Sequence, residues 1–429
     1  MSDYLFLMES RVSPDQWHVL MAIERVAASL EMNLYLVGGA IRDLVAGSPI
    51  DDLDFVVEGK ASKLVKELCR RGARVLSENA SLQSAEVEFA NGIMGSVSMA
   101  RTERFSKPGA PPRIAPATII ADLRRRDFPM NSIGVSLSPN SRGLLLDPSN
   151  GLADTEKREI RPQHNYIFFD DPVRIFRSVR LRARLGFTWD AKTAALFQSA
   201  RDAGLAQNAS GEPVAHELRQ LARERNPVPI LKELDKEKLL RALNPRLQGN
   251  AIDWQGIAKT AKASQLLAAA GLRAPSFPLF LHQLIRKLPA RDKTALYDRL
   301  RLPRADRNLP QKLESDAKKL AKELVGKAAG TPTKLFQLLS KTPPDLLLLL
   351  MTSFAQKTIQ SRLKTYFTKY LPLRANSPAK ELEQLGVKPG TPRCQKILDA
   401  YFFASIEGEL RTPNQQQKYL ARLVQQIKP

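Results

Sequence analysis

Residues 34–59, LYLVGGAIRDLVAGSPIDDLDFVVEG, constrain the fold more than any other part of the chain. An apolar, strand-like run is followed at once by Gly38 and Gly39, and a second strand-like run carries Asp52 and Asp54 among apolar residues. Side chains two positions apart on a strand project from the same face. The stretch therefore predicts a strand, a turn, a short helix and a second strand on which two carboxylates point the same way.

Paired carboxylates of this kind repel each other unless a cation lies between them. Mg²⁺ is the expected cation, because it prefers oxygen ligands and commonly bridges protein carboxylates to substrate phosphates. An isolated acid pair is better interpreted as a solvated strand end, but the presence of Gly38 and Gly39 favours a binding site. Glycines that open a helix let backbone N–H groups approach an anion, and Arg42 follows one turn later. Together these residues predict a site for Mg²⁺ and a triphosphate.

The chain is strongly basic: 66 Lys and Arg residues against 44 Asp and Glu give a net charge of +22. Solubility does not require so much positive charge, so a polyanionic partner is expected, although a generically basic protein would have the same composition. With 429 residues, of which 43% are hydrophobic, the chain is long enough for several folded domains.

Three features predict a cytoplasmic protein that has no membrane segment. Cys69 and Cys394 give neither a disulfide framework nor metal-site spacing, which fits a reducing compartment. The first residues, MSDYLFLMES, lack a basic segment followed by a long apolar one, so no signal peptide is expected. The longest apolar run, residues 346–351, is far too short to span a bilayer and predicts a buried helix segment.

Residues 1 to about 140 have an α/β pattern and the rest of the chain has a helical one. We expect a helix that begins at Pro14, strands at residues 34–37, 52–57 and 73–76, and a hairpin within residues 85–99. The proline-rich segment RFSKPGAPPRIAPA predicts a mobile loop. Beyond Asp147 the pattern is amphipathic and helical, and no further strand-rich segment is expected.

The run LVGGAIRDLVAGSPIDDLDFVVEG resembles the GG-xx-RD…D-x-D signature of class II tRNA nucleotidyltransferases (CCA-adding enzymes) and bacterial poly(A) polymerases. The runs RRDFPMNSIGVSL, LLDPSNGLADTEKREIRP and DDPVRIFRSVRLRARLGF are similar to further blocks of the family, and residues 379–412 resemble the helical tail of its longer bacterial members. The resemblance is specific over residues 30–190, whereas residues 235–375 share only helical character. It implies an α+β fold: a polymerase-β-like nucleotidyltransferase head (1–147), then an all-helical neck (148–235), body (236–343) and RNA-binding tail (344–429).

In this family the D-x-D acids bind two divalent ions, so the resemblance assigns catalysis and the binding of two Mg²⁺ ions to Asp52 and Asp54. It implies ATP and CTP as substrates and tRNA as the partner. No protein partner is evident from the sequence. It assigns the triphosphate to a glycine turn and the helix that follows: Gly38, Gly39, Arg42 and Asp43. It assigns the ribose 2′-hydroxyl to the RRD block: Arg125, Arg126 and Asp127, with Asn131.

The DDPVR segment matches the block that reads the base of the incoming nucleotide in this family. Here Asp171 would accept and Arg174 would donate, because their spacing places both on one helix face. The alternative is structural, since an aspartate before a proline is also a favourable helix N-cap. Arg177 and Arg180 extend a basic face that would meet phosphates or RNA, although a solvated helix face is the simpler interpretation of these two residues alone.

One position departs from the family pattern. Relatives carry an acid five residues before the arginine of an A-R-x-E-like run, and this position falls on Ser96. A third carboxylate usually completes the metal site and can act as general base, which a serine cannot do at neutral pH. Glu86 or Glu88, on the preceding strand, is a possible neighbouring substitute. Ser96 leaves three alternatives to normal activity, namely slow catalysis, a different substrate or lost activity, and an active enzyme remains the favoured interpretation because every other head motif is present.

The tail carries a basic stretch that predicts RNA binding, because basic side chains supply phosphate affinity and aromatic ones can stack on bases. Its aromatic residues, such as Tyr366, Phe367 and Tyr370, also suit a helical core, and for Phe367 the core is the favoured interpretation. The basic residues assigned to RNA are Lys357, Arg362, Lys364, Lys369 and Arg374.

Three activities fit the sequence. The favoured one is addition of CCA or of the terminal A to tRNA, because residues 105–117 have the full length of a loop that is shortened in relatives restricted to CC addition. A poly(A) polymerase of the same family is the enzymatic alternative. A catalytically weakened RNA-binding paralogue is the third, and Ser96 is its main support.

Overall fold

The computed structural model describes residues 3–50, 52–89, 92–107, 110–209 and 211–427. The chain divides into two compact units, Met1–Glu217 with Ile230–Pro245, and Leu218–Pro229 with Arg246–Pro429. The predicted boundaries at residues 147 and 343 lie inside these units, and the four-part division stays a prediction.

The elements up to residue 243 form the first unit, apart from the part of the chain between Glu217 and Ile230. They are α1 (Asp3–Arg11), α2 (Pro14–Ser29), β1 (Asn33–Val37), α3 (Gly39–Val45), β2 (Leu53–Glu58), α4 (Ala61–Arg70), β3 (Arg74–Asn79), β4 (Ser84–Glu88), β5 (Met94–Met99), β6 (Arg101–Arg104), β7 (Arg113–Pro116), α5 (Ile119–Arg124), η2 (Pro129–Asn131), β8 (Gly134–Ser136), η3 (Pro139–Ser141), β9 (Leu145–Leu146), α6 (Gly151–Lys157), β10 (Glu159–Ile160), α7 (Ile167–Asp170), α8 (Val173–Leu185), β11 (Thr188–Trp189), α9 (Ala191–Asp202), η4 (Leu205–Asn208), α10 (Gly211–Arg223), α11 (Pro227–Lys236) and α12 (Leu239–Leu243).

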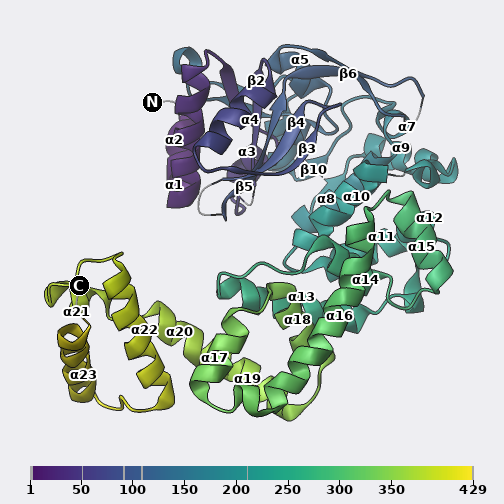
Figure 1. Ribbon diagram of the computed structural model, residues 1–429. Helices are drawn as coiled ribbons and strands as arrows, with labels where there is room; N and C mark the ends of the chain where they lie inside the picture. Colours follow the sequence, from purple (N-terminus) through teal and green to yellow (C-terminus); the bar gives the residue numbers. More distant parts are fainter. Residues whose placement is uncertain (1–2, 51, 90–91, 108–109, 210, 428–429) are drawn as a thin grey trace. The chain divides into compact units, whose positions relative to one another are not determined.

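A seven-stranded sheet is the centre of the first unit, with the order β3-β4-β5-β2-β1-β8-β9 (Figure 1). Strands β2 and β5 run parallel, and the other neighbouring strands run antiparallel. The predicted strands at 34–37, 52–57 and 73–76 correspond to β1, β2 and β3, and the predicted hairpin corresponds to β4 and β5. The existence of these strands is confirmed, but Asp52 lies one residue before β2 and not on it.

The two faces of the sheet are covered differently. On the first face, alternate residues of the strands, such as Leu53, Phe55 and Val97, pack against helices α1 to α4 in one large core. The intervening residues project to the second face, where Val56 and a few neighbours pack against Leu123 of α5. We call this side, which carries Val56 and α5, the second face.

Helix α2 begins where the sequence predicts, at Pro14, and contributes to the core of the first face. The Ser13 side chain accepts a hydrogen bond from the backbone N–H of Gln16, and the Gln16 side-chain oxygen accepts one from the backbone N–H of Ser13. This capping box and the proline at the first helical position fix the start of the helix. Val19, Leu20 and Ile23 are buried on its inner side.

Two short strand pairs were not predicted. Part of the proline-rich segment forms β7, which pairs antiparallel with β6 and corrects the prediction of a loop for residues 113–116. Proline is tolerated there because β7 is an edge strand of a two-stranded sheet. Strands β10 and β11 form a two-residue parallel pair within the region predicted to be helical.

The regular elements of the second unit are helical in every part that the structure describes. Its elements are η5 (Gly249–Ala251), α13 (Trp254–Ala269), α14 (Phe277–Leu284), α15 (Ala290–Arg299), α16 (Arg304–Val325), η6 (Lys327–Ala329), α17 (Pro332–Ser340), α18 (Pro344–Ser353), α19 (Lys357–Thr365), η7 (Tyr366–Tyr370), α20 (Leu371–Ala375), α21 (Ala379–Gln384), α22 (Pro392–Glu407) and α23 (Pro413–Gln426). The α+β prediction, with strands concentrated in the head, is therefore confirmed.

Two hydrophobic cores formed by described residues lie in this unit. The larger one includes the buried run of α18 from Leu346 to Leu350, as predicted, and Phe402 of α22. The smaller one joins α21, α22 and α23 through residues such as Leu382, Ile397 and Leu420. Among the described helices, none combines the length and the apolar character that a bilayer span requires.

Candidate nucleotidyl-transfer site

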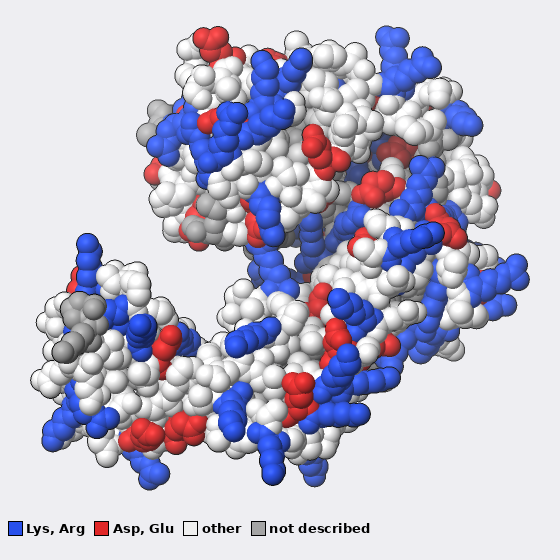
Figure 2. Space-filling view, in the orientation of Figure 1, with Lys and Arg blue, Asp and Glu red and all other residues white. Residues whose placement is uncertain are grey.

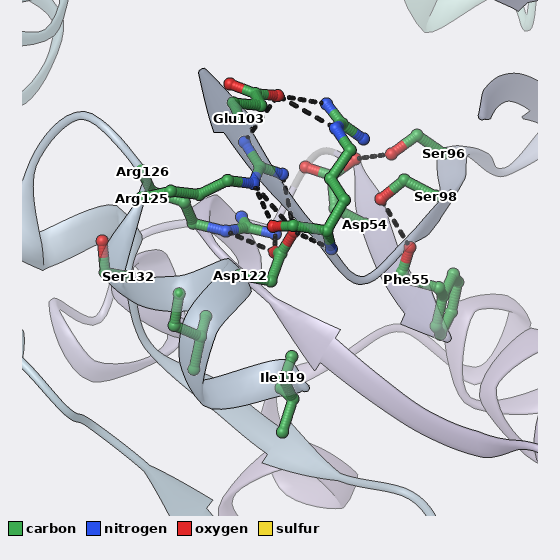
Figure 3. A network of polar contacts seen from close by, with 12 residues as sticks. Asp54, Phe55, Ser96, Ser98, Glu103, Ile119, Asp122, Arg125, Arg126 and Ser132 are labelled. Carbon is green, nitrogen blue, oxygen red and sulfur yellow. Dashed lines mark hydrogen bonds and ion pairs between the residues drawn. The ribbon is translucent and has the colours of Figure 1, made fainter. Parts of the chain in front are cut away.

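Asp54 lies on the second face of the sheet, next to Ser96. The two residues are register partners on the parallel strands β2 and β5, and residues directly opposite on neighbouring strands project from the same face. The Ser96 hydroxyl donates a hydrogen bond of 2.6 Å to the Asp54 carboxylate, as Figure 3 shows. Ser96, at the position where the family resemblance led us to expect an acid, is thus immediately beside the predicted metal ligand.

The close pairing of β2 and β5 depends on Gly95. A Cβ atom at this position would overlap the carbonyl oxygen of Leu53 and would crowd the ring of Phe89. Glycine is therefore required where the two backbones approach each other. This approach places the Ser96 hydroxyl within hydrogen-bonding distance of Asp54.

The acid pair fits Mg²⁺ chemically. Asp54 is half-buried and carries its charge beside a neutral hydroxyl, and Asp52 is also half-buried. Within the described residues, no group of three or more His, Cys, Asp and Glu side chains comes together at a geometry that could hold a metal ion. Mg²⁺ does not need such a cage, because it is usually held by one or two carboxylates together with water and substrate phosphates.

The glycine turn after β1 has the predicted form. Gly38 has a φ of +74°, which favours glycine, and its N–H donates to the carbonyl of Ile133 at 2.9 Å. The Arg42 side chain folds back beside Gly39 and donates to Asn131 and to Asp43, at 2.5 and 2.8 Å. Burial lowers the pKa of Arg42 despite the neighbouring Asp43. The four residues predicted to bind the triphosphate therefore lie together, and the Gly38 N–H already donates within the fold.

Arg125 and Arg126 converge on Asp122, a fully buried carboxylate that the sequence reasoning missed (Figure 3). Arg125 approaches one oxygen at 2.6 Å and Arg126 approaches the other at 3.0 Å, while the backbone N–H of Arg101 donates at 3.1 Å. Burial raises the pKa of Asp122, but Arg126 and Arg125 outweigh it and leave the pKa below its usual value. Glu103 adds a second carboxylate partner for Arg125 at 2.9 Å.

Asp127 and Asn131 belong to a second chain of polar contacts. The Asp127 carboxylate accepts from Asn131 at 3.1 Å and from Arg177 at 2.7 Å. Burial raises the pKa of Asp127, but Arg177 and Arg174 outweigh burial and bring the pKa down to about 2. Because Asn131 also accepts from Arg42, this contact chain joins the glycine turn to α8.

Arg177 and Arg180 face Glu217 of α10 rather than solvent, which differs from the basic face expected from the sequence. Their guanidinium groups lie 2.6 and 2.8 Å from the two oxygens of Glu217. Burial raises the pKa of Glu217, but the two arginines lower it to about 2. A buried arginine needs such a partner, because an unpaired charge in the interior is costly.

Asp171 precedes helix α8 instead of lying within it, so the expectation of one shared helix face is corrected. Its carboxylate accepts from the backbone N–H of Val173 at 3.1 Å, as a capping aspartate would, but the N-cap residue of α8 is Pro172, one residue after the predicted cap. The other oxygen lies 3.7 Å from Arg174. Arg174 is buried, and its guanidinium also approaches the carbonyl of Arg125 at 3.5 Å. Capping and pairing thus hold the two residues together.

The residues that sequence reasoning missed are acids that hold arginines. Asp122 lies three and four residues before the arginines that it binds, a helical spacing that is visible in the run ADLRRRD. Glu217 lies 40 residues from Arg177, and no local pattern marks this pairing. Glu86 is also paired: His216 lies 3.5 Å from its carboxylate.

The basic residues of the tail differ in their surroundings. Lys357, Lys364 and Lys369 are exposed, and Figure 2 shows lysine and arginine side chains spread over the surface with fewer acidic ones between them. Arg362 donates to the carbonyl of Leu324, and Arg374 pairs with Asp399 above the ring of Phe402. Tyr366, Phe367 and Tyr370 are buried in the larger core of their unit, as favoured for Phe367.

Known proteins resemble this chain in sequence and fold. Residues 34–161 match the family model described as the poly A polymerase head domain. The A-adding tRNA nucleotidyltransferase of Geobacter sulfurreducens is 28% identical over 94% of this chain and 47% of its own length. The CCA-adding enzyme of Pseudomonas putida (strain W619) is 30% identical over 74% of this chain and 78% of its own length. The chain spans about half the length of the A-adding relatives that it matches.

A solved structure, the apo form II of a CCA-adding enzyme, has the same fold. Its TM-score is 0.54 at 22% identity, with 98% of each chain covered. The predicted polymerase-β-like head and helical remainder are thereby confirmed. Because the Pseudomonas relative is matched over most of its length, the chain belongs to the class II tRNA nucleotidyltransferase family, which includes the CCA-adding enzymes.

Proposed function

We propose that the protein is a template-independent tRNA nucleotidyltransferase that adds CCA, or the terminal A alone, to the 3′ end of tRNA from CTP and ATP in the cytoplasm. The placement of Asp54 carries the proposal. Its carboxylate is half-buried beside a neutral hydroxyl, on the face of the sheet that also packs against α5, and within the region that matches the poly A polymerase head domain. The names of the Geobacter and Pseudomonas relatives support the choice of tRNA as the substrate.

Asp52 and Asp54 would hold two Mg²⁺ ions, which supply activation of the RNA 3′-hydroxyl and charge neutralisation on the departing pyrophosphate. Ser96 keeps the Asp54 carboxylate in one orientation by donating to it. The glycine turn and Arg42 would contact the triphosphate. The Asp122 contacts support this role, because they hold Arg126 beside Gly38.

The remaining head and neck residues would position the nucleotide. Asp127 and Asn131 are held by Arg177 and Arg42, and in this frame they would define where the ribose lies. Asp171 and Arg174 would offer an acceptor and a donor to the base edge. Their mutual contact at 3.7 Å is long for a hydrogen bond, which leaves hydrogen-bonding capacity for the base.

The tail lysines would bind the tRNA backbone, because their ammonium groups are exposed. The buried tail aromatics do not support base stacking there. Arg362 and Arg374 are weaker candidates than the lysines, since each already contacts protein acceptors.

The second candidate function is RNA binding with little or no turnover, and Ser96 is the specific observation in its favour. A serine at this position removes one carboxylate from the strand next to Asp54. A poly(A) polymerase is the third candidate, on the basis of the matched head domain alone. These candidates predict different products from the same assay.

The deciding experiment incubates the full chain with tRNA that ends at the discriminator base, or at CC, and sequences the extended 3′ ends. We expect CCA on the first substrate or A on the second, with CTP, ATP and Mg²⁺ present. Long adenosine tracts would favour the poly(A) polymerase. Failure to extend either tRNA, with tRNA binding intact, would favour the binding-only paralogue.

Asp52→Ala should abolish incorporation and leave tRNA affinity largely intact, because the change removes a metal ligand and no phosphate contact. Glu9→Ala, at an exposed position on α1, is the matched control and should retain full activity. Full activity of Asp52→Ala would place the metal elsewhere.

A further inference from the structure

The ribbon formed by β6 and β7 has one face that is held against the rest of its unit. Arg101 of this face is buried, and Glu103 is half-buried. The Glu103 carboxylate lies 2.9 Å from Arg101 and 2.9 Å from Arg125, the second of which Figure 3 shows. Ile114 of β7 is the register partner of Glu103 and packs against the large core of the unit. This inner face therefore fixes the ribbon in place, and its charges are already paired.

The opposite face of the ribbon is exposed. Because side chains alternate along a strand, Thr102 and Arg104 project away from the inner face, together with their register partners Ala115 and Arg113. All four residues are exposed. We call them the outer face. It consists of two small side chains and, at one end, two arginines.

The two arginines of the outer face are directly opposed across the ribbon. Like charges in this position destabilise a strand pair. Among the residues that the structure describes, no acid forms an ion pair with Arg104 or Arg113, whereas Arg101 and Arg125 share Glu103 on the inner face. The outer pair therefore does not stabilise the fold, and an anion bound from outside would remove its repulsion.

The chemistry of the outer face fits a phosphate backbone. A guanidinium group binds phosphate through two parallel hydrogen bonds, and opposed residues have Cβ atoms only about 5 Å apart, so both arginines can contact one stretch of a polyanion. Thr102 and Ala115 are short enough to let such a chain approach the ribbon closely. An acidic protein would meet the same charge, but a protein interface usually has an aromatic or other large apolar centre, which these four residues do not provide.

We propose that the outer face binds the sugar–phosphate backbone of the RNA substrate through Arg104 and Arg113. The inference rests on the proposed function for the identity of the polyanion. It gives the first unit an RNA-binding surface of its own, in addition to the lysines of the tail.

The ribbon is connected to the predicted triphosphate site by a short series of contacts. The backbone N–H of Arg101 donates to Asp122 at 3.1 Å, Asp122 also holds Arg126 at 3.0 Å, and Arg126 lies beside Gly38. The outer face and the glycine turn therefore belong to one unit whose parts are held together. For this reason a short RNA that carries only the reacting end is a sufficient probe.

The test measures the affinity of the full chain for an acceptor-stem RNA hairpin ending in CC, by filter binding across a salt series. In the double variant Arg104→Gln with Arg113→Gln, the slope of log affinity against log salt should become less steep by roughly 2, because two phosphate contacts are lost. The double variant Arg104→Lys with Arg113→Lys should keep the slope, since both charges remain. An unchanged slope in the glutamine variant would overturn the proposal.

A matched control removes the same charge from another part of the unit. Arg70 and Arg71 of α4 are exposed and both pair with Glu67, so Arg70→Gln with Arg71→Gln should leave the slope as it is. An equal decrease of the slope in this control would show a general effect of net charge, and the outer face would then have no special role.

Two further measurements exclude other roles of the arginine pair. Urea denaturation should find the ribbon variant at least as stable as the unchanged protein, because the repulsion is removed. Lower stability with an unchanged slope would mean that the pair is structural. If polyglutamate displaces the hairpin as well as unlabelled hairpin does at equal charge, and only when both arginines are present, the outer face binds acidic protein and the proposal is wrong.

The RNA surface and the proposed function fail separately. If the slope decreases in the ribbon variant but the unchanged protein extends no tRNA, the surface stands and nucleotidyl transfer falls. If the protein extends tRNA and the slope is the same in the ribbon variant, the activity stands and the surface falls.

Discussion

The carboxylates of the first unit fall into two groups with opposite surroundings. Asp122, Asp127 and Glu217 are buried, and each is paired with one or two arginines. Asp54 is half-buried and accepts from the neutral hydroxyl of Ser96, and the described part of the chain offers it no ion pair. The arginines neutralise the first group, whereas the charge of Asp54 stays available to a cation.

This difference distinguishes carboxylates that stabilise the fold from a carboxylate that is suited to bind a cation. Asp127 and Glu217 join α8 to the residues after α5 and to α10, and Asp122 holds Arg125 and Arg126 in place. The pKa values of all three acids stay low because their arginines outweigh the effect of burial. A catalytic metal ligand cannot be used in this way, because an arginine at 3 Å would compete with Mg²⁺. If this view is correct, substitutions in the two groups should affect different properties.

The largest expected effect is on activity. Asp54→Asn keeps the shape of the side chain and its ability to accept from Ser96, but it removes the charge that binds the cation. We expect incorporation of AMP into tRNA ending in CC to fall to background, while the free energy of unfolding changes by less than about 0.5 kcal/mol. Steady-state incorporation and urea denaturation measure the two quantities. Retained activity would place Asp54 in the structural group.

Asp122→Asn should show the reverse behaviour. The substitution leaves Arg125 and Arg126 without the negative charge that they share, and breaking a buried ion pair costs about 3–5 kcal/mol. Urea denaturation should detect this loss of stability. Glu78→Gln, at an exposed position of β3, is the control and should be neutral. A stable Asp122→Asn protein with normal urea dependence would contradict the framework role.

Acidification tests the same pairs. Asp127 and Glu217 have pKa values of about 2 in the folded protein, against about 4 in an unfolded chain. Each therefore contributes stability above about pH 4, and this contribution is lost as the pH falls toward 2. We expect a loss on the order of 2–3 kcal/mol per carboxylate in this window, measured by urea denaturation.

Arg177→Met should flatten that pH dependence, because Arg177 contacts both carboxylates. The control Arg70→Met, at an exposed position on α4, should leave the dependence as it is. An unchanged acid profile in Arg177→Met would mean that other groups cause the loss.

Local sequence patterns predicted the strands and the turn that carry the site. Features that depend on contacts between distant residues could not be predicted from such patterns. Alternation and glycine placement located β1, β2 and the hairpin, since these signals lie within a few residues. The pairing of Arg177 with Glu217 could not be predicted in this way, because a basic residue on an amphipathic helix looks the same whether it meets solvent or a distant acid. The strand β7 escaped prediction for a related reason: its partner, β6, stabilises a proline-containing segment that has little strand propensity of its own.

The tail illustrates the same limit within the second unit. The sequence placed lysines and aromatics on one stretch, and the structure separates them: Lys364 and Lys369 are exposed while Phe367 between them is buried. Helical periodicity alone did not establish which of these residues would bind RNA. We therefore expect substitution of the exposed lysines to have the smallest effect of those predicted, a moderate change in tRNA affinity.

Replacing both Lys364 and Lys369 with Gln should weaken tRNA binding moderately at low salt and hardly at all at high salt. Each phosphate contact releases counterions, so the slope of log affinity against log salt should decrease by roughly 2 in the double variant. Phe367→Leu is the matched comparison on the same turn; it should lower stability and leave the salt slope unchanged, because the ring is buried. Filter binding of tRNA across a salt series measures the slopes. If the salt slope of tRNA affinity is unchanged in the lysine variant, Lys364 and Lys369 do not contact the tRNA backbone. If the slope decreases while the single-turnover rate of incorporation stays normal, the tail binds tRNA and does not take part in catalysis at Asp54.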